Sequence, residues 1–232
     1  VILAPGINIK RTQLCGRNFE YMSEDPYLVS EMMVPLIKGI QKADVAACVK
    51  HFAVNGQETN RLWVDTIVDK RTLYEIYLPG FDAAVHRAHS YSIMGAYNLL
   101  NGQHCCENRY LLGDILRKEW GYDGAVISDW GGVHDTAAAE SELDLEMSVT
   151  FNFDDYCMAN PLKKAVEDGK VKEKHIDKKV ANLLRLMYRL KMLPGTGERK
   201  KGCFHSIEHI KAARKTAEES VILLKNDKTL LP

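Results

Sequence analysis

The sequence predicts an α/β fold in which helices cover a parallel sheet, and three observations lead to that prediction. Short apolar runs alternate along the chain with segments whose apolar residues recur every three or four positions, as strands alternating with amphipathic helices do. The runs are apolar on both faces, which is typical of strands buried between helix layers. Polar side chains gather at the carboxyl end of each run, where α/β folds place their functional residues.

Five apolar runs are the predicted strands, and they lie at residues 1–6, 46–52, 91–98, 124–130 and 143–147. The side chains that follow or end the second, third and fourth runs include Lys50, His51, Tyr97, Asp129 and Trp130. Because parallel strands end at one edge of a sheet, we expect these side chains to meet there. Asp129 is therefore predicted to lie at the rim of a site and to point into it.

Three helical patterns lie between or after these runs. The first follows Asp69, and Pro79 should kink it. The second is predicted to begin with Asn160 as its N-cap and Pro161 as its first helical residue, and to end near Gly169. The third covers residues 176–190. The apolar residues that share one face of the first helix or of the third are Leu73, Ile76, Tyr77, Phe81, Ala84, Val85, Ile176, Val180, Leu183, Leu184, Met187 and Leu190.

The predicted strands are too few to close an eight-stranded (β/α)8 barrel, which typically takes about 250 residues. We therefore expect an incomplete TIM-barrel-like domain of about five βα units over residues 1–193, whose missing strands come from a segment upstream of Val1. Residues 194–205 include all but the first residue of "LPGTGERKKG", and this composition predicts a linker. Residues 206–232 predict a helix capped by Ser206, then a short strand, at the start of a second domain.

Composition argues against several classes of partner. The chain has 31 basic and 31 acidic residues, so it carries no electrostatic footprint for nucleic acid or an anionic membrane. Its apolar runs are all shorter than the roughly 18 residues of a membrane span. None of the six cysteines sits in a CxxC pair, which favours free thiols in a reducing compartment such as the cytoplasm, although a periplasmic or secreted protein stays open.

We expect neither a metal nor a cofactor. The segment His104–Asn108 brings four candidate ligands together, but adjacent side chains diverge, and ligand pairs usually need spacers. The sequence has no Walker loop and no GxGxxG motif.

An aspartate at a strand end can also be a helix N-cap or one half of a structural ion pair. The neighbours of Asp129 favour a functional interpretation. Trp130 offers a flat apolar surface that suits the apolar face of a sugar ring. Gly131 and Gly132 let the backbone approach a ligand closely.

Arg17, Lys50, His51 and Arg61 are candidates to hold the Asp129 carboxylate ionised and to donate hydrogen bonds. Basic neighbours would lower the pKa of Asp129, while burial would raise it. Other interpretations stay open at this point. Lys50 could be salt-bridged at the edge of a cleft or form a Schiff base, as in a lyase, and His51 could be a core histidine.

Five motifs occur in an order that closely resembles glycoside hydrolase family 3, in its β-glucosidase branch. They are "LCGRNFEYMSEDPYL" at 14–28, "KHFAVNGQETNR" at 50–61, "MGAYNLLNG" at 94–102, "GYDGAVISDWGGVHD" at 121–135 and "LDLEM" at 143–147. A further segment, "AARKTAEESVILLKND" at 212–227, is similar to the opening of that family's second domain, an α/β sandwich. The resemblance covers nearly the whole chain.

The resemblance implies a retaining β-glucosidase without a metal or cofactor, acting on terminal non-reducing β-D-glucosyl residues of β-glucosides or cello-oligosaccharides. It implies that Asp129 is the nucleophile. It also implies that Tyr97 lies beside Asp129 and orients it. The residues that it implies bind the sugar hydroxyls of the −1 subsite are Arg17, Lys50, His51 and Arg61, and Trp130 is the expected apolar surface for the ring. A homo-oligomer stays open.

Two carboxyl groups of the family are expected outside this chain: an upstream aspartate that binds the outer hydroxyls, and the acid/base glutamate of the second domain. Glu24, Glu58 and Glu107 are the stand-ins for the acid within the chain, although no motif supports them. We therefore expect the chain alone to lack normal activity and to need the missing segments, in cis or as a separate chain.

Some positions depart from the family pattern. Ser141 and Glu142 replace a usual Ala-Gly before "LDLEM", and Ser148 replaces a usual proline after it, so we expect a reshaped loop there. The chain lacks the "KHFPGHG" motif of the β-N-acetylglucosaminidase branch. The alternatives that we retain are a β-xylosidase or other exo-acting glycosidase of the same family, and a non-catalytic sugar-binding fragment.

Overall fold

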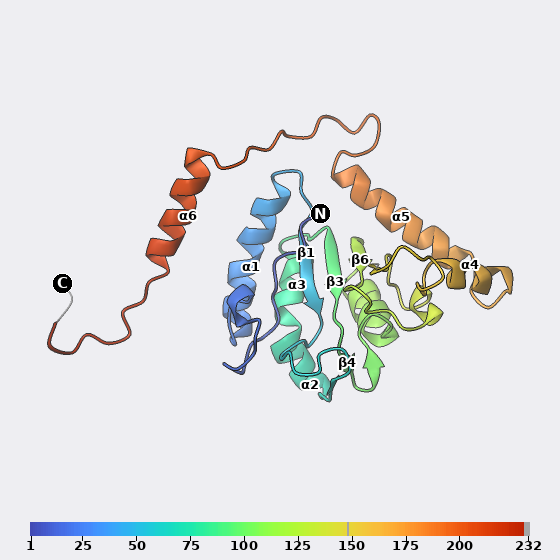
Figure 1. The fold of residues 1–232 in the computed structure, drawn as a ribbon, viewed down its shortest axis with the longest axis horizontal. Helices are drawn as coiled ribbons and strands as arrows, with labels where there is room; N and C mark the ends of the chain where they lie inside the picture. The colour runs from blue at the N-terminus through green and yellow to red at the C-terminus, as the bar shows by residue number, and fades with distance from the viewer. Residues whose placement is uncertain (148, 230–232) are drawn as a thin grey trace. The chain divides into compact units, whose positions relative to one another are not determined.

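A computed structural model describes residues 1–147 and 149–229, so Ser148 and its predicted effect on the loop lie outside the described residues (Figure 1). The chain divides into two units, residues 1–199 and 200–232, and the division falls inside the predicted linker. The first unit holds the sheet and all the residues predicted to carry chemistry.

The sheet of the first unit is parallel, with strands in the order β1 (Cys48–Phe52), β3 (Ser92–Gly95) and β6 (Ala125–Ile127). Cys48 pairs with Ser92, and Ile93 pairs with Val126. These strands fall within the second, third and fourth predicted runs. The α/β class with a parallel sheet is confirmed.

The first and fifth predicted runs form single parallel bridges rather than strands. Ile2 and Gly6 bridge to the β1 side of the sheet, and Leu145 bridges to Ile127 beyond β6. Pro5 has no N–H to donate to a ladder, which limits pairing in the first run. In the fifth run, the Asp144 side chain accepts a hydrogen bond from the Val126 amide at 2.7 Å, so a side chain replaces a backbone partner there.

The helices on one side of the sheet are α1 (Pro26–Gln41) and α3 (Pro79–His86), which pack against each other (Figure 1). The segment after Asp69 is broken as predicted at Pro79: the short α2 (Lys70–Thr72) and the π-helical turn η2 (Leu73–Tyr77) precede it, and α3 begins at the proline. The core between helices and sheet is fully buried and includes Phe52, Phe81, Ile93, Met33 and Ile37.

The remaining elements of the first unit are mostly short or lie beyond β6, and η3 precedes β6. They are η1 (Asn18–Glu20), β2 (Asp65–Thr66), β4 (Leu99–Leu100), β5 (Gln103–His104), the π-helix η3 (Tyr110–Glu119), η4 (Thr136–Ala139), α4 (Asn160–Glu167) and α5 (Lys174–Arg189). Strands β2, β4 and β5 form a second small sheet. It is built from the segments that follow β1 and β3, so it braces the loops at their carboxyl ends.

The predicted N-cap of α4 is wrong by one residue. Ala159 occupies the cap position without a side-chain hydrogen bond, and Asn160 is the first helical residue. The Asn160 side chain is drawn away from the cap because it donates to Asp154 Oδ1 at 2.7 Å. The predicted end is confirmed, since the helix stops at Glu167 and Gly169 has a φ of 72°.

Asp144 of the "LDLEM" motif ties the last part of the sheet to two helices. Its carboxylate accepts from Arg117 Nη2 of η3 at 2.6 Å and from Asn182 Nδ2 of α5 at 2.8 Å, besides the Val126 amide. Burial raises the pKa of Asp144 despite these donors. The motif thus has a structural role that its sequence alone does not reveal.

The two described departures from the family pattern are both engaged in contacts. The Ser141 hydroxyl lies within hydrogen-bond distance of two acceptors, the Ala138 and Cys106 carbonyls at 2.9 and 3.1 Å, and Glu142 Oε2 pairs with Lys178 Nζ at 2.6 Å. Glu142 has a φ of 81°, in the left-handed region that favours glycine. The change from the family's usual glycine therefore places a side chain at a strained backbone position.

The second unit contains α6 (Ile207–Glu219) and the single turn η5 (Asp227–Thr229). Ser206 is the N-cap, as predicted, because its hydroxyl accepts from the His209 amide at 3.2 Å. The short strand predicted after α6 is wrong for the described residues up to 229, because a strand needs a pairing edge and this unit contains no other strand there. None of the helices described in either unit is long and apolar enough to cross a membrane.

Candidate active site

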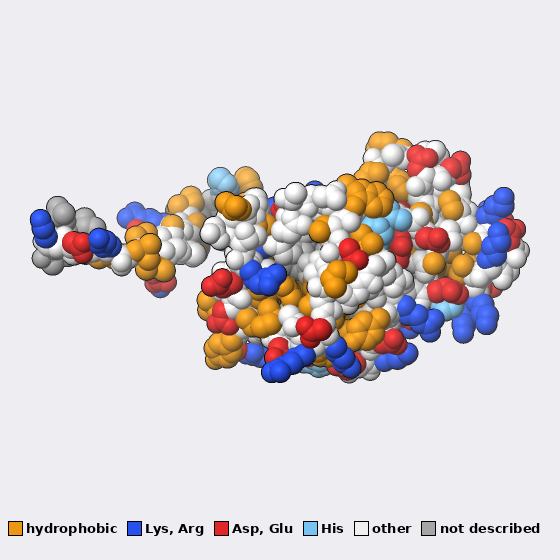
Figure 2. Space-filling view, turned by 90° about the horizontal axis from the view of Figure 1, so that it is seen from below, with side chains coloured by type: hydrophobic (Ala, Val, Ile, Leu, Met, Phe, Trp, Pro, Cys, Tyr) orange, Lys and Arg blue, Asp and Glu red, His pale blue; other side chains and the backbone are white. Residues whose placement is uncertain are grey.

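The predicted site residues lie where β1, β3 and β6 end. Lys50 and His51 belong to the last part of β1, Tyr97 lies two residues beyond β3, and Asp129 lies two residues beyond β6. Parallel pairing of the three strands brings their carboxyl ends to one edge. Figure 2 looks from below onto this end of the sheet, where β1 ends in Figure 1.

Asp129 is buried, with an exposed fraction of 5%. Its Oδ1 accepts a hydrogen bond from the Trp130 amide at 2.9 Å, and its Oδ2 lies 3.4 Å from His51 Nε2. Burial raises the pKa of Asp129 and outweighs the lowering by the Trp130 amide, Tyr97 and Arg17. Of the two opposing effects expected from the sequence, burial therefore prevails. A desolvated carboxylate of this kind is more basic than one in water.

His51 is a neutral histidine held on both its backbone and its ring. Its backbone N–H donates to Asn8 Oδ1, and its carbonyl accepts from Asn8 Nδ2, both at 2.8 Å. Its Nδ1 lies 2.5 Å from the Tyr21 hydroxyl, and its Nε2 lies 3.2 Å from Arg17 Nη2. Burial, with the charges of Arg17 and Lys50, lowers the pKa of His51 to about 2. The ring is therefore a polar neighbour of Asp129 without charge.

The cationic side chains are paired mainly with two glutamates. Arg17 Nε lies 2.6 Å from a Glu20 carboxylate oxygen, and Lys50 Nζ lies 3.2 Å from the other. Arg61 Nη1 lies 2.9 Å from Glu58 Oε2, and Arg17 Nη1 lies 3.9 Å from Glu58 Oε1. The salt-bridge interpretation of Lys50 agrees with this geometry. Charged donors with further N–H groups to offer are thus fixed around the nucleophile candidate.

Tyr97 lies beside Asp129, close enough for each group to shift the pKa of the other. The hydroxyl donates to the Trp130 carbonyl at 2.8 Å, while the Arg61 guanidinium lies over the Tyr97 ring at 5.1 Å from its centroid. Burial and the nearby Asp129 charge raise the pKa of Tyr97 to about 12, so the phenol stays protonated. The Trp130 backbone therefore links Tyr97 to Asp129, and its indole, 43% exposed, is left open to solvent.

Sequence reasoning missed three residues that position this site. Glu20 and Tyr21 lie in the quoted "GRNFEY" motif but were given no role there. Their signal was present: a glutamate and a tyrosine three and four residues after Arg17. Asn8 belongs to no quoted motif, and its role depends on the bridging of the first run beside β1, which sequence alone does not show.

The cysteine-rich segment after His104 is part of the core. Cys105 and Cys106 are fully buried, and burial raises the pKa of Cys105 to about 12. Among residues 1–147 and 149–229, no three or more His, Cys, Asp or Glu side chains are grouped closely enough to hold a metal ion.

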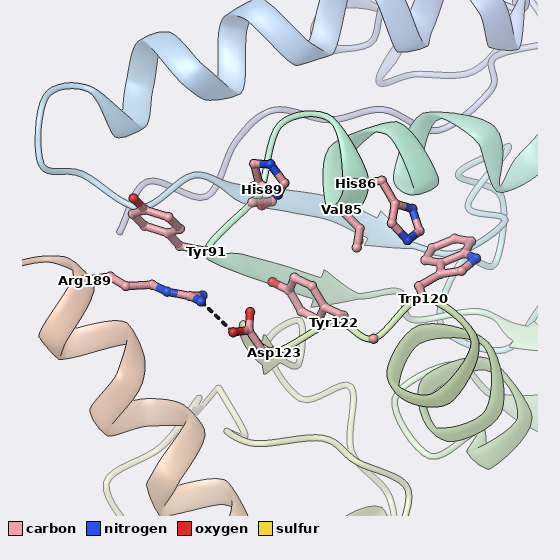
Figure 3. Close-up of a pocket in the computed structure, with 10 residues that line it drawn as sticks. Val85, His86, His89, Tyr91, Trp120, Tyr122, Asp123 and Arg189 are labelled. Atoms are coloured by element: carbon pink, nitrogen blue, oxygen red, sulfur yellow. Dashed lines mark hydrogen bonds and ion pairs between the residues drawn. The ribbon is translucent and has the colours of Figure 1, made fainter.

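A hollow of about 360 Å³ lies at the opposite end of the sheet, where β3 and β6 begin (Figure 3). Tyr91, Trp120 and Tyr122 line it, together with the ion pair between Asp123 and Arg189, whose N and O atoms lie 2.6 Å apart. Parallel α/β folds place their chemistry at the carboxyl ends of strands, so we do not assign the reaction to this hollow.

Comparison with known proteins agrees with the motif resemblance. The family model for the glycosyl hydrolase family 3 N-terminal domain matches residues 1–186. "Beta-glucosidase BoGH3A" of Bacteroides ovatus is 49% identical over 97% of this chain and 31% of its own length. An exo-alpha-(1->6)-L-arabinopyranosidase of Bifidobacterium longum is 40% identical over all of this chain and 30% of its own length.

The solved structures give the same result. The crystal structure of DesR, a beta-glucosidase from Streptomyces venezuelae in complex with D-glucose, aligns with a TM-score of 0.92 and 37% identity. The alignment covers 100% of this chain and 31% of DesR. The chain therefore spans about a third of the length of the proteins that it matches.

Proposed function

The chain belongs to glycosyl hydrolase family 3 through that family's N-terminal domain, and on this basis we propose that it carries the nucleophile and the first sugar-binding subsite of a retaining β-glucosidase. The observation that supports this most is the setting of Asp129: a buried carboxylate at the carboxyl end of a parallel sheet, with cationic and neutral hydrogen-bond donors around it.

In the proposed reaction, Asp129 attacks C1 of a terminal β-glucosyl residue while the bond from C1 to the leaving oxygen breaks. A general acid gives its proton to that oxygen, and a glycosyl-enzyme ester forms on Asp129. Water then attacks C1 and gives its proton to the residue that acted as the general acid, and the Asp129 carboxylate is freed. The Trp130 amide holds Oδ1 and so orients the carboxylate, whose negative charge stabilises the oxocarbenium-like transition state.

Arg17, Lys50 and Arg61 are proposed to donate to the sugar hydroxyls, with charged hydrogen bonds that contribute about 1.5–3 kcal/mol each. The neutral His51 can share in this binding without adding a repulsive positive charge to the transition state. Lys50 is a poor candidate for a Schiff base, because its ammonium is paired with Glu20 and a nucleophilic amine must be neutral.

We place the general acid outside this chain. Glu58 is paired with Arg61, Glu107 accepts from the His134 and Asp135 amides at 2.5 and 3.0 Å, and Glu24 is exposed ahead of α1. Retaining catalysis needs a second carboxyl group about 5–5.5 Å from the nucleophile. The proposal thus keeps this chain alone without normal activity, which a segment in cis or a separate chain would restore.

The same proposal extends to the architecture. Residues 1–193 would form an arc of a (β/α)8 barrel, in which the two bridged runs take the outer positions on either side of the three strands. Residues 206–232 would open the α/β sandwich domain after the linker at 194–205. The exposed apolar residues Val221, Ile222, Leu223 and Leu224 support this, because they need a partner surface.

The decisive experiment is covalent trapping of the full-length protein with 2,4-dinitrophenyl 2-deoxy-2-fluoro-β-glucoside. Its leaving group needs no general acid, so labelling reports on the nucleophile. We expect mass spectrometry to find one fluoroglucosyl group on the peptide containing Asp129, and none in Asp129→Asn. Asp123→Asn, a change at the opposite end of the sheet, is the matched control and should label normally. A label on another residue, or hydrolysis with inversion at C1, would refute the assignment.

The arabinopyranosidase relative supports a second candidate, an exo-acting glycosidase for a pentopyranose. A retaining nucleophile would serve either sugar, so specificity depends on contacts at the outer carbons. Comparing kcat/KM for the nitrophenyl β-glucoside, β-xyloside and α-L-arabinopyranoside decides between them. We expect the glucoside to be preferred, and preference for a pentoside would replace the glucosidase proposal while leaving the nucleophile assignment intact.

A further inference from the structure

Three aromatic rings form a contact cluster near the candidate active site, and one of them is an exposed tryptophan. The ring centroid of Trp63 lies 5.4 Å from that of His104 and 5.2 Å from that of His134. The two histidine rings lie 4.0 Å apart. Trp63 contacts both histidine rings, and because it is 59% exposed, much of the indole remains open. We call Trp63, His104 and His134 the ring cluster.

The ring cluster adjoins the nucleophile through two connections. Trp63 lies two residues after Arg61, whose guanidinium covers the Tyr97 ring. His104 Nδ1 lies 3.0 Å from the Tyr97 carbonyl oxygen. Tyr97 in turn is joined through Trp130 to the nucleophile candidate. Figure 2 shows histidine side chains among hydrophobic ones on this same end of the sheet.

Backbone hydrogen bonds to Glu107 hold the segment that carries His134. Glu107 accepts hydrogen bonds from the His134 and Asp135 amides, which fixes the segment that follows Trp130. Burial and the neighbouring His104 lower the pKa of His134, so this ring stays neutral near pH 7. Trp63 is thus a large flat side chain packed against two imidazole rings, rather than an indole surrounded by solvent.

An exposed indole that packs on neighbouring rings suits a ring-shaped ligand. Sugars and aromatic groups both present a flat face that can stack on tryptophan, which has a large apolar surface. The sugar that is cleaved would lie among the ion-paired donors around Asp129. A rim surface joined to the site through Tyr97 is then placed to meet the part of the substrate that leaves.

We propose that Trp63, supported by His104 and His134, is the stacking platform for the leaving group of the substrate. The site would thereby prefer β-glucosides whose leaving group is a ring, either an aromatic ring or a second hexose. This proposal rests on the glucosidase function proposed above and adds to it the residue that receives the leaving group.

The test compares three substrates of the full-length protein: phenyl β-glucoside, cellobiose and β-glucosyl fluoride, whose leaving group has no ring. For Trp63→Ala we expect kcat/KM to fall by about tenfold on the two ring-bearing substrates, mainly through a higher KM, and to change less than about twofold on the fluoride. Trp63→Phe should retain most of the wild-type value. Tyr188→Ala, which removes an exposed aromatic from α5, is the control and should leave all three substrates unchanged.

The outcomes separate the two proposals. A fall on phenyl glucoside alone or cellobiose alone would support the platform and identify which ring it takes. An equal fall on all three substrates, or no change on any, would refute the platform while leaving the glucosidase function in place. A wild-type protein without activity on the fluoride would refute the function itself and the platform with it.

Discussion

Acid should destabilise the first unit through His51. The native ring is buried beside Arg17 and Lys50, which lowers its pKa to about 2, whereas the unfolded chain binds a proton near pH 6.5. As the pH falls through 6.5, the unfolded state therefore gains a proton that the native state refuses. Stability due to this residue is complete above pH 6.5 and declines steadily below it.

The size of the effect follows from this difference. One proton bound only by the unfolded state changes the free energy of unfolding by about 1.4 kcal/mol per pH unit, once the pH is well below 6.5. Between pH 7 and pH 5 the loss amounts to about 2 kcal/mol for one histidine. Asp129 acts in the opposite sense, because burial raises its native pKa above the ordinary carboxyl value.

The assay compares wild-type protein with His51→Gln, whose side chain has no proton to gain in this range. The free energy of unfolding is measured at pH 7 and pH 5 from the urea dependence of hydrogen exchange in peptides from β1, β3 and β6. Wild-type protein should lose about 2 kcal/mol more than the variant between the two pH values. His86→Gln, at an exposed histidine of α3, should behave like wild type. Equal losses in wild type and His51→Gln would refute the reasoning.

Three further changes test other parts of the structure. Glu20→Gln should lower kcat/KM for β-glucosides by about ten- to a hundredfold, because it removes the anion that holds two of the cations of the site, and unchanged kinetics would contradict this. Asp144→Asn should lower the free energy of unfolding in urea by about 3 kcal/mol, since it breaks a buried ion pair. Gly95→Ala should lower the free energy of unfolding by about 1–3 kcal/mol in the same assay, because its Cβ would lie 2.5 Å from the Cys106 sulfur. The control is Gly39→Ala, which lies in open space on α1 and should raise the free energy of unfolding by up to about 1 kcal/mol.

The fold class could be predicted because its signal is local. Apolar runs and helical spacing record which faces are buried, and those faces are set by residues close together in sequence. The extent of pairing at the edges could not be predicted in the same way. Pro5 limits the first run, and in the fifth a carboxylate of Asp144 takes an amide that a neighbouring strand would otherwise bond.

For the site, too, sequence predicted the general position of the residues but not their contacts. The strand-end rule brought Lys50, His51, Tyr97 and Asp129 to one edge from sequence position alone. The rule says nothing of which atoms then contact each other. The Tyr97 hydroxyl, for example, donates to the Trp130 carbonyl, a contact that only the folded chain fixes.

The charge balance of the site gives the proposed mechanism a physical consequence. Three cations, at positions 17, 50 and 61, face three carboxylates, Glu20, Glu58 and Asp129, and the Lys10 ammonium also interacts with Glu58 and Arg17. An ionised Asp129 therefore offsets positive charge that Glu20 and Glu58 leave unbalanced. Formation of an ester on Asp129 would remove one negative charge and leave a net positive charge in a partly buried site. An unbalanced positive charge is destabilising where water is excluded. The glycosyl-enzyme is therefore destabilised, which favours its hydrolysis and the release of the Asp129 carboxylate.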